Sequence, residues 1–170
     1  MSHDLHLLVG TTKGLFIVHG GTDSNGWDVT GPLCDGWPIN HVAGCARTGH
    51  LWAAGGGDFH GAGVWHSQDR GQTWALTRLT RGAMDQWAAN DPDFAAMVGW
   101  DDRPLPFGDD FAQIWSLSFA HGRLYAGTKP AGLVASADMG ATWEKIPGLT
   151  DHPSAKDWQG GAAGLVLHSI

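Results

Sequence analysis

The chain has 170 residues and a formal net charge of −7, and it is rich in glycine and tryptophan, with 26 and 10 residues respectively. It has only 10 Lys and Arg residues, too few for the basic surface that binds nucleic acid or an anionic membrane. No apolar run is long enough to span a bilayer, and no signal-type apolar core follows the first residues. We therefore expect a cytoplasmic protein with neither a nucleic-acid nor a membrane partner.

The two cysteines, Cys34 and Cys45, are expected to be free thiols in such a protein rather than a disulfide. Neither the Cys-x-x-Cys nor the His-x-x-x-His spacing of zinc sites occurs in the sequence. We therefore expect no metal site and no cofactor.

Three stretches of the chain repeat the same order of features: an apolar run, a turn containing glycine, a second apolar run, a polar turn and then a tryptophan. These stretches span residues 7–29, 51–76 and 124–146. Short apolar runs separated by turns favour antiparallel β-strands. Each stretch therefore predicts the second, third and fourth strands of a four-stranded unit.

Further apolar runs precede the second and third stretches, at residues 39–43 and 114–119, and each predicts the inner first strand of its unit. A similar run at residues 164–170 predicts one more inner strand. That strand would complete the first unit if the two ends of the chain meet, or it would begin another unit. The chain therefore contains about three copies of one repeated unit.

An octapeptide with the pattern Ser-x-Asp-x-Gly-x-Thr-Trp occurs twice, at residues 67–74 and 136–143. Each copy lies between two apolar runs, where a hairpin turn is expected. In such a turn the Asp carboxylate can accept hydrogen bonds from backbone N–H groups, and the Gly can take a positive φ. The Thr opens the return strand, and the Trp supplies a large ring for burial. The identical residues are Ser67, Asp69, Gly71, Thr73 and Trp74 in the first copy and Ser136, Asp138, Gly140, Thr142 and Trp143 in the second.

This octapeptide resembles the Asp-box, the bacterial neuraminidase repeat of sialidase-like β-propellers. The resemblance implies an all-β propeller of four-stranded antiparallel blades, in which the Asp-box joins the third and fourth strands on the face away from the active site. About three blades would be half of a six- or seven-bladed ring. We therefore expect residues 1–170 to form one partial propeller domain, closed either by a second copy in a homodimer or by further blades after the C-terminus.

Residues 80–112 interrupt the repeat between the second and third blades. Short helical turns are predicted within residues 80–90 and 91–100, the second with Asp91 as its cap and Pro92 at its first position. A loop of this length in a compact domain is usually functional or disordered, and its Trp, Phe and Met residues disfavour disorder. The segment is therefore predicted to be an insertion loop between blades.

Antiparallel strands place this insertion on the same face as the turns between second and third strands, and opposite the octapeptides. Carboxylates beside tryptophans are typical of sugar sites, where rings stack on pyranose faces and acids bind hydroxyls or move protons. Turn, packing and structural roles are the alternatives for the same Asp, Trp and His residues. The ligand-binding candidates are Trp37, Asp58, His60, Trp87, Lys129 and Trp158, and the catalytic candidates are Asp85, Asp109 and Asp110.

Sialidases of this family would further imply a triad of arginines, an Arg-Ile-Pro segment and a Tyr nucleophile with a Glu partner. The chain has no Arg-Ile-Pro segment, its only tyrosine, Tyr125, lies in a repeat strand, and its only glutamate, Glu144, follows an octapeptide. The sialidase residues are therefore not carried over. We expect a binding or interaction scaffold that takes a carbohydrate or protein ligand on the insertion face. The alternative is a sialidase- or xyloglucanase-like glycoside hydrolase that uses an aspartate pair on the same face.

Overall fold

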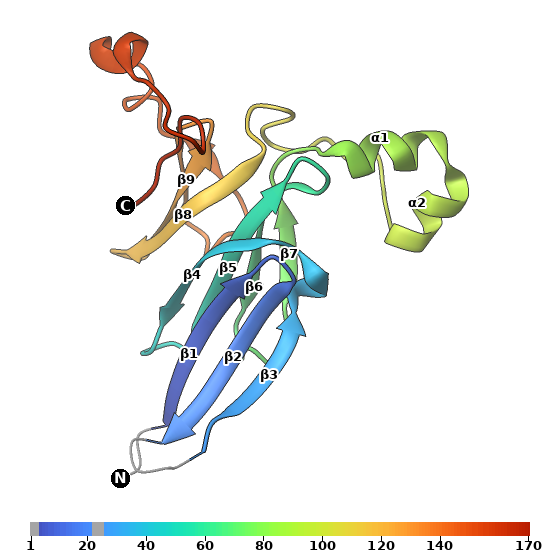
Figure 1. Cartoon of the computed structure of the whole chain (residues 1–170), viewed down its shortest axis with the longest axis vertical. Helices are drawn as coiled ribbons and strands as arrows, with labels where there is room; N and C mark the ends of the chain where they lie inside the picture. The colour runs from blue at the N-terminus through green and yellow to red at the C-terminus, as the bar shows by residue number, and fades with distance from the viewer. Residues whose placement is uncertain (1–3, 22–25) are drawn as a thin grey trace.

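A computed structural model of the chain describes residues 4–21 and 26–170, and its strands form three antiparallel blades (Figure 1). Blade 1 contains β1 (Asp4–Thr11), β2 (Gly14–Gly21) and β3 (Asp28–Leu33). Blade 2 contains β4 (Ile39–Cys45), β5 (His50–Gly57), β6 (Gly61–Ser67) and β7 (Ala75–Arg78). Blade 3 contains β8 (Gln113–Ala120), β9 (Arg123–Lys129), β10 (Leu133–Ser136) and β11 (Glu144–Lys145). Helices α1 (Ala83–Asn90) and α2 (Pro92–Val98) lie between blades 2 and 3 in the sequence, and short 3₁₀ turns occur at Cys34–Gly36 and Pro153–Asp157.

Within each blade, every strand pairs antiparallel with the next strand of the chain. Blades 2 and 3 are connected by one residue pair, Gly56 with Gln113, which joins their inner regions through β5 and β8. The predicted order of strands is confirmed for all three blades, apart from the run at the C-terminus. The fold is a partial β-propeller.

The blades stack face to face, and the middle blade is buried on both faces. Successive residues of a strand point to opposite faces of the sheet. On β5, Trp52 and Ala54 belong to the core shared with blade 3, whereas Ala53 belongs to the core shared with blade 1. All three side chains are fully buried. The near-continuous burial of β5 therefore reflects its position between two neighbouring sheets.

The octapeptide at residues 67–74 forms a turn closed by its own side chains. The Asp69 carboxylate accepts hydrogen bonds from the Thr73 backbone N–H at 2.9 Å, the Thr73 hydroxyl at 2.6 Å and the Ser67 hydroxyl at 2.8 Å. These bonds, led by the one from the Thr73 hydroxyl, lower the pKa of Asp69 to about 2. Gly71 has a φ of 91°, and its carbonyl accepts the indole N–H of Trp74 at 3.0 Å. The predicted roles of Asp and Gly in this turn are confirmed.

The second octapeptide repeats these bonds, and both copies pack against the preceding blade. Asp138 accepts from the Thr142 N–H at 2.8 Å and from the Thr142 hydroxyl at 2.6 Å. In blade 2, the indole N–H of Trp52 donates to the Met139 carbonyl at 2.9 Å, which ties this turn to blade 2. The octapeptides are thus contact points between blades as well as hairpin turns.

The predicted inner strand at residues 164–170 is wrong. Outside an isolated bridge that ends at Gly164, this run has no strand pairing, and Leu167 instead lies against blade 3. The Leu167 N–H donates to the Thr128 carbonyl at 3.1 Å, and its carbonyl accepts from the Ser116 hydroxyl at 2.8 Å. A strand needs a ladder partner along its length, and among the described residues β1 pairs only with β2. The run therefore does not pair with β1 to complete blade 1.

Both cysteines are free thiols, as predicted, and burial raises the pKa of Cys34 to about 12. Within residues 4–21 and 26–170, no helix combines the length and the apolar character needed to cross a membrane. In the same part of the chain, no three His, Cys, Asp or Glu side chains are grouped to hold a metal ion.

Candidate functional site

Residues 80–112 are docked onto the turn between β5 and β6. The Ala83 N–H donates to the Asp58 carbonyl and the Met84 N–H donates to the Phe59 carbonyl, both at 2.8 Å. The contact is close, since a Cβ added at Gly82 would lie 2.3 Å from the Gly61 nitrogen. The segment therefore shares one face with the turn between the second and third strands of blade 2, as predicted, and Figure 1 shows both helices at that end.

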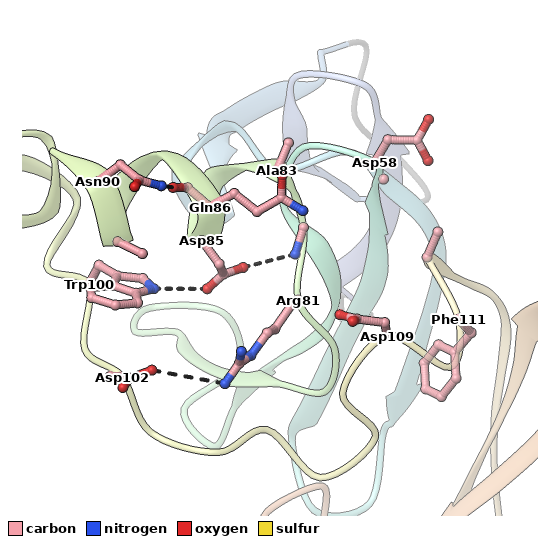
Figure 2. Close-up of a pocket in the computed structure, with 14 residues that line it drawn as sticks. Asp58, Arg81, Ala83, Asp85, Gln86, Asn90, Trp100, Asp102, Asp109 and Phe111 are labelled. Carbon is pink, nitrogen blue, oxygen red and sulfur yellow. Dashed lines mark hydrogen bonds and ion pairs between the residues drawn. The ribbon is translucent and has the colours of Figure 1, made fainter.

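A buried ion pair fixes α1 to the end of β7. The Asp85 carboxylate accepts from both terminal nitrogens of Arg78, at 2.8 and 2.6 Å, and from the Gly82 N–H at 2.8 Å. It also accepts the indole N–H of Trp100 at 3.0 Å (Figure 2). Burial raises the pKa of Asp85, but the hydrogen bonds from Arg78 and Gly82 outweigh it, and the net pKa is lowered. Asp85 is therefore an ionised anchor that joins β7, α1 and the loop after α2.

Helix α2 begins as the sequence predicts. The Asp91 carboxylate accepts from the backbone N–H groups of Asp93 and Phe94, both at 3.0 Å, and Pro92 occupies the first helical position. This capping satisfies N–H groups that have no partner inside the helix. The two helices are thus ordered by local caps and by the Arg78–Asp85 pair.

A cavity of about 750 Å³ opens between the segment and blade 2 (Figure 2). We call it the acidic cavity, because its charged lining residues are Asp58, Asp85, Asp102, Asp109 and Arg81. Arg81 lies 3.9 Å from Asp102, and Asp85 is neutralised by Arg78. In Figure 2 the carboxylate of Asp58 points away from the other labelled carboxylates. The cavity therefore has an excess of negative charge, to which Asp109 contributes most directly and Asp58 adds from its exposed position in the lining.

A second hollow, of about 930 Å³, runs beside β7, and we call it the β7 groove. Its aromatic lining residues include Trp37, His60, Trp65 and Phe94. The ring of Trp37 lies 4.9 Å from that of His60 and 6.2 Å from that of Trp65, the latter edge-on. Burial, with the nearby charge of Arg78, lowers the pKa of His60, so this imidazole is favoured in its neutral form. The groove thus combines aromatic side chains with the charged residues Asp35, Arg78, Asp101 and Arg103.

Large apolar side chains remain exposed on this end of the molecule. Trp87 is 58% exposed and Met97 is 74% exposed, with Phe59 and Val98 also exposed. The Trp87 ring contacts Phe59 at 5.3 Å and Phe94 at 6.0 Å between ring centres. Trp87 is therefore not packed in the interior of the fold, which was the alternative to a binding role. It belongs to an apolar surface patch.

The structure brings together only some of the predicted site residues. Asp58, Asp85 and Asp109 line the acidic cavity, Trp37 and His60 line the β7 groove, and Trp87 lies in the exposed patch. The other three candidates have partners elsewhere: Asp110 pairs with Lys145 at 2.7 Å, Lys129 lies 5.6 Å from the Trp115 ring centre, and the Trp158 indole donates to Ser154 at 3.1 Å. Their predicted roles in binding or catalysis stay predictions.

Several residues of the two hollows were not singled out from the sequence. Arg78 and Trp100, which position Asp85, are separated from it by seven and fifteen residues and belong to no recognisable motif. Asp102 lies in a segment without regular secondary structure, and no motif marks it in the sequence. Trp65 matched an ordinary repeat strand, so only the folded structure places it in the β7 groove.

Comparisons with known proteins give similarities to solved structures only. No family model matches the chain, and no curated protein matches it. A solved structure of YCF48 bound to a D1 peptide aligns with a TM-score of 0.48 and 17% sequence identity, over 86% of this chain and 37% of that one. The chain thus spans little more than a third of that structure. The fold assignment rests on the strand pairing described above, and the Asp-box resemblance stays a prediction from the octapeptides.

Proposed function

We propose that this partial β-propeller is a binding scaffold that engages a protein partner through the face formed by residues 80–112. The observation that carries the proposal is the combination of an acidic cavity and an exposed apolar patch on the same helix, α1. The Arg78–Asp85 pair fixes this helix to blade 2, so the surface is held in place before any partner binds. Preorganised surfaces lose less conformational entropy on binding.

The chemistry of the surface favours a protein over a sugar. Exposed Trp and Met side chains such as Trp87 and Met97 are typical of protein interfaces, and contiguous apolar patches on a protein often mark them. The carboxylates of Asp58 and Asp109 would attract a Lys or Arg side chain of the partner. We therefore infer a partner segment that carries apolar residues next to a basic one.

Glycoside hydrolysis has less support. A general acid in this chemistry needs a carboxyl group with a raised pKa, whereas the pKa of Asp85 is lowered. Asp110 is paired with Lys145 outside the acidic cavity. Of the catalytic candidates only Asp109 remains, and its partner in an aspartate pair would have to be Asp58 or Asp102, the other carboxylates in the lining.

The proposal is tested with Trp87→Ala and Asp109→Asn, both substitutions of exposed residues. Partners cross-linked to the wild-type protein would be identified, purified and titrated against each variant by calorimetry. We expect affinity to fall by about tenfold or more, as for interface hot spots, while the melting temperature stays unchanged. Matched controls are Trp27→Ala, an exposed tryptophan on blade 1, and Asp110→Asn.

Three outcomes would contradict the proposal. Binding only to a glycan array, lost in Trp87→Ala, would replace the protein partner by a carbohydrate. Hydrolysis of a chromogenic glycoside that disappears in Asp109→Asn would establish the enzyme instead. A large drop in melting temperature for both variants, with no change in any binding, would leave the segment with a purely structural role.

A further inference from the structure

Strand β7 is an edge strand with one unpaired side. It ends the sheet order, and its only strand partner among the described residues is β6. The Leu79 N–H donates to the Ala62 carbonyl at 2.8 Å, and bonded pairs alternate along an antiparallel ladder. Thr77 lies two residues before Leu79, so its N–H and C=O groups also point toward β6. Leu76 and Arg78 therefore direct their N–H and C=O groups toward the open side.

The outer strands of the other blades are protected against further pairing, whereas β7 is not. Proteins commonly blunt an exposed edge with proline or by keeping the edge strand very short. Strand β3 contains Pro32, and β11 has only 2 residues, Glu144 and Lys145. Strand β7 has 4 residues and no proline.

Leu76, Thr77 and Arg78 of β7 line the β7 groove, and two side chains of its lining carry buried donors that have no acceptor among the described residues. Trp65 is only 5% exposed, and its indole Nε1 has no hydrogen-bond partner in the described part of the chain. The Nε of Arg78 is likewise buried and unpaired among those residues. Both side chains line the groove. A buried donor without an acceptor costs free energy, so a ligand that supplies an acceptor to either of these two donors would be bound more favourably.

We infer that the β7 groove binds an extended peptide segment of the partner, which adds to blade 2 as a further strand next to β7. Its carbonyl and N–H groups would pair with those of Leu76 and Arg78, and an apolar side chain would lie against Trp37 and Phe94. An acceptor on the peptide would receive the Trp65 indole N–H. Main-chain bonds supply affinity in this mode, and the pockets for alternate side chains supply specificity. The inference rests on the proposed function, because it specifies how a protein partner is bound.

The test uses a displayed library of random linear dodecapeptides selected on the 170-residue protein. Each hit is synthesised, its affinity is measured by fluorescence anisotropy, and each of its backbone nitrogens is methylated in turn. Since a strand presents alternate N–H groups to its neighbour, we expect losses of about tenfold or more at every second methylated position.

On the protein, Leu76→Pro removes an N–H on the open side of β7 and spares the bonds to β6. We expect it to weaken binding by about tenfold or more. The matched control is Lys145→Pro, at an outward position of β11, since the Ile146 N–H bonds inward to Leu133. Trp65→Phe removes the unpaired donor while keeping an aromatic ring, and it should weaken binding by about fivefold even if Leu76→Pro fails to fold.

The inference is overturned if no linear peptide binds, if the methylation losses do not alternate, or if Leu76→Pro binds as well as wild type. If a peptide no longer binds Asp109→Asn but binds Leu76→Pro as well as wild type, the inference is overturned and the proposed function at the acidic cavity is supported. If a peptide no longer binds Leu76→Pro but its affinity for Trp87→Ala and Asp109→Asn is unchanged, the β7 groove is supported as the binding site and the acidic cavity is refuted as the binding surface.

Discussion

The glycines of the two octapeptides provide a matched test of how the blades pack. Gly71 has a φ of 91° and Gly140 a φ of 100°, so an alanine would be strained at both positions. Their surroundings differ, however. A Cβ at Gly71 would lie 2.4 Å from the Cδ1 atom of Ile17 in blade 1, whereas the nearest atom at Gly140 would be Cδ1 of Leu124 at 3.4 Å. Only Gly71→Ala therefore places a methyl group in steric conflict with a side chain of the neighbouring blade.

The two substitutions should differ in size for this reason. Gly140→Ala should lower the free energy of unfolding by about 1–3 kcal/mol through backbone strain alone. Gly71→Ala should lower it by about 1–3 kcal/mol more, because Ile17 is almost fully buried and the added methyl overpacks the core between blades 1 and 2.

Urea denaturation of single and double variants measures the effect. Ile17→Val deletes the Cδ1 methyl and should by itself cost about 0.5–1.5 kcal/mol. Combined with Gly71→Ala it should relieve the clash, giving a coupling free energy of about 1 kcal/mol or more. Combined with Gly140→Ala it should be additive. Additivity in both pairs would refute the packing of the first octapeptide against blade 1.

Three further predictions concern the ion pair, acidic pH and self-association. Asp85→Ala should destabilise the protein by about 3 kcal/mol in urea denaturation, because it leaves the largely buried guanidinium of Arg78 unpaired. The pKa values of Asp69 and Asp138 are about 2, below the usual 3.8, so both carboxylates stabilise the fold above about pH 4. This stabilisation is lost as the pH falls toward 2, and Asp→Asn at both sites should flatten the dependence of the urea midpoint between pH 5 and pH 2. In sedimentation experiments the chain should self-associate through the outer face of blade 1, and Leu7→Lys should shift it toward monomer; a wild-type monomer at micromolar concentration would contradict this.

The predictable parts of this fold are the ones built from local chemistry. Within one octapeptide, Asp69 bonds Thr73 four residues away, and Gly71 takes its positive φ between them. Asp91 caps α2 through residues two and three positions further on. Such contacts depend on spacing alone, so the sequence shows them directly.

The unpredicted parts depend on docking between distant elements. The Asp85 anchor needs Arg78 from the end of β7 and Trp100 from the loop after α2, and their meeting is decided by how the segment lies on blade 2. Lys129 was expected at the binding face, but its side chain turns to Trp115. The apolar run at 164–170 predicts a strand, but Leu167 bonds instead to Thr128 and Ser116 of blade 3, and these contacts between distant segments have no signal in the sequence.

The outer face of blade 1 can be interpreted by comparing equivalent positions in the three blades. Val9 of β1, Ala53 of β5 and Ala126 of β9 occupy equivalent positions in their blades. Each of them pairs with an apolar residue of the next strand, respectively Phe16, Trp65 and Val134. Ala53 and Ala126 are fully buried against the preceding blade, whereas Val9 is 41% exposed. We therefore expect the face that carries Val9 to contact another blade. This equivalence supports the expectation that a second copy or further blades pack there. It also separates that apolar face from the one proposed to bind a partner, since blade packing explains the first and no equivalent in the repeat explains the second.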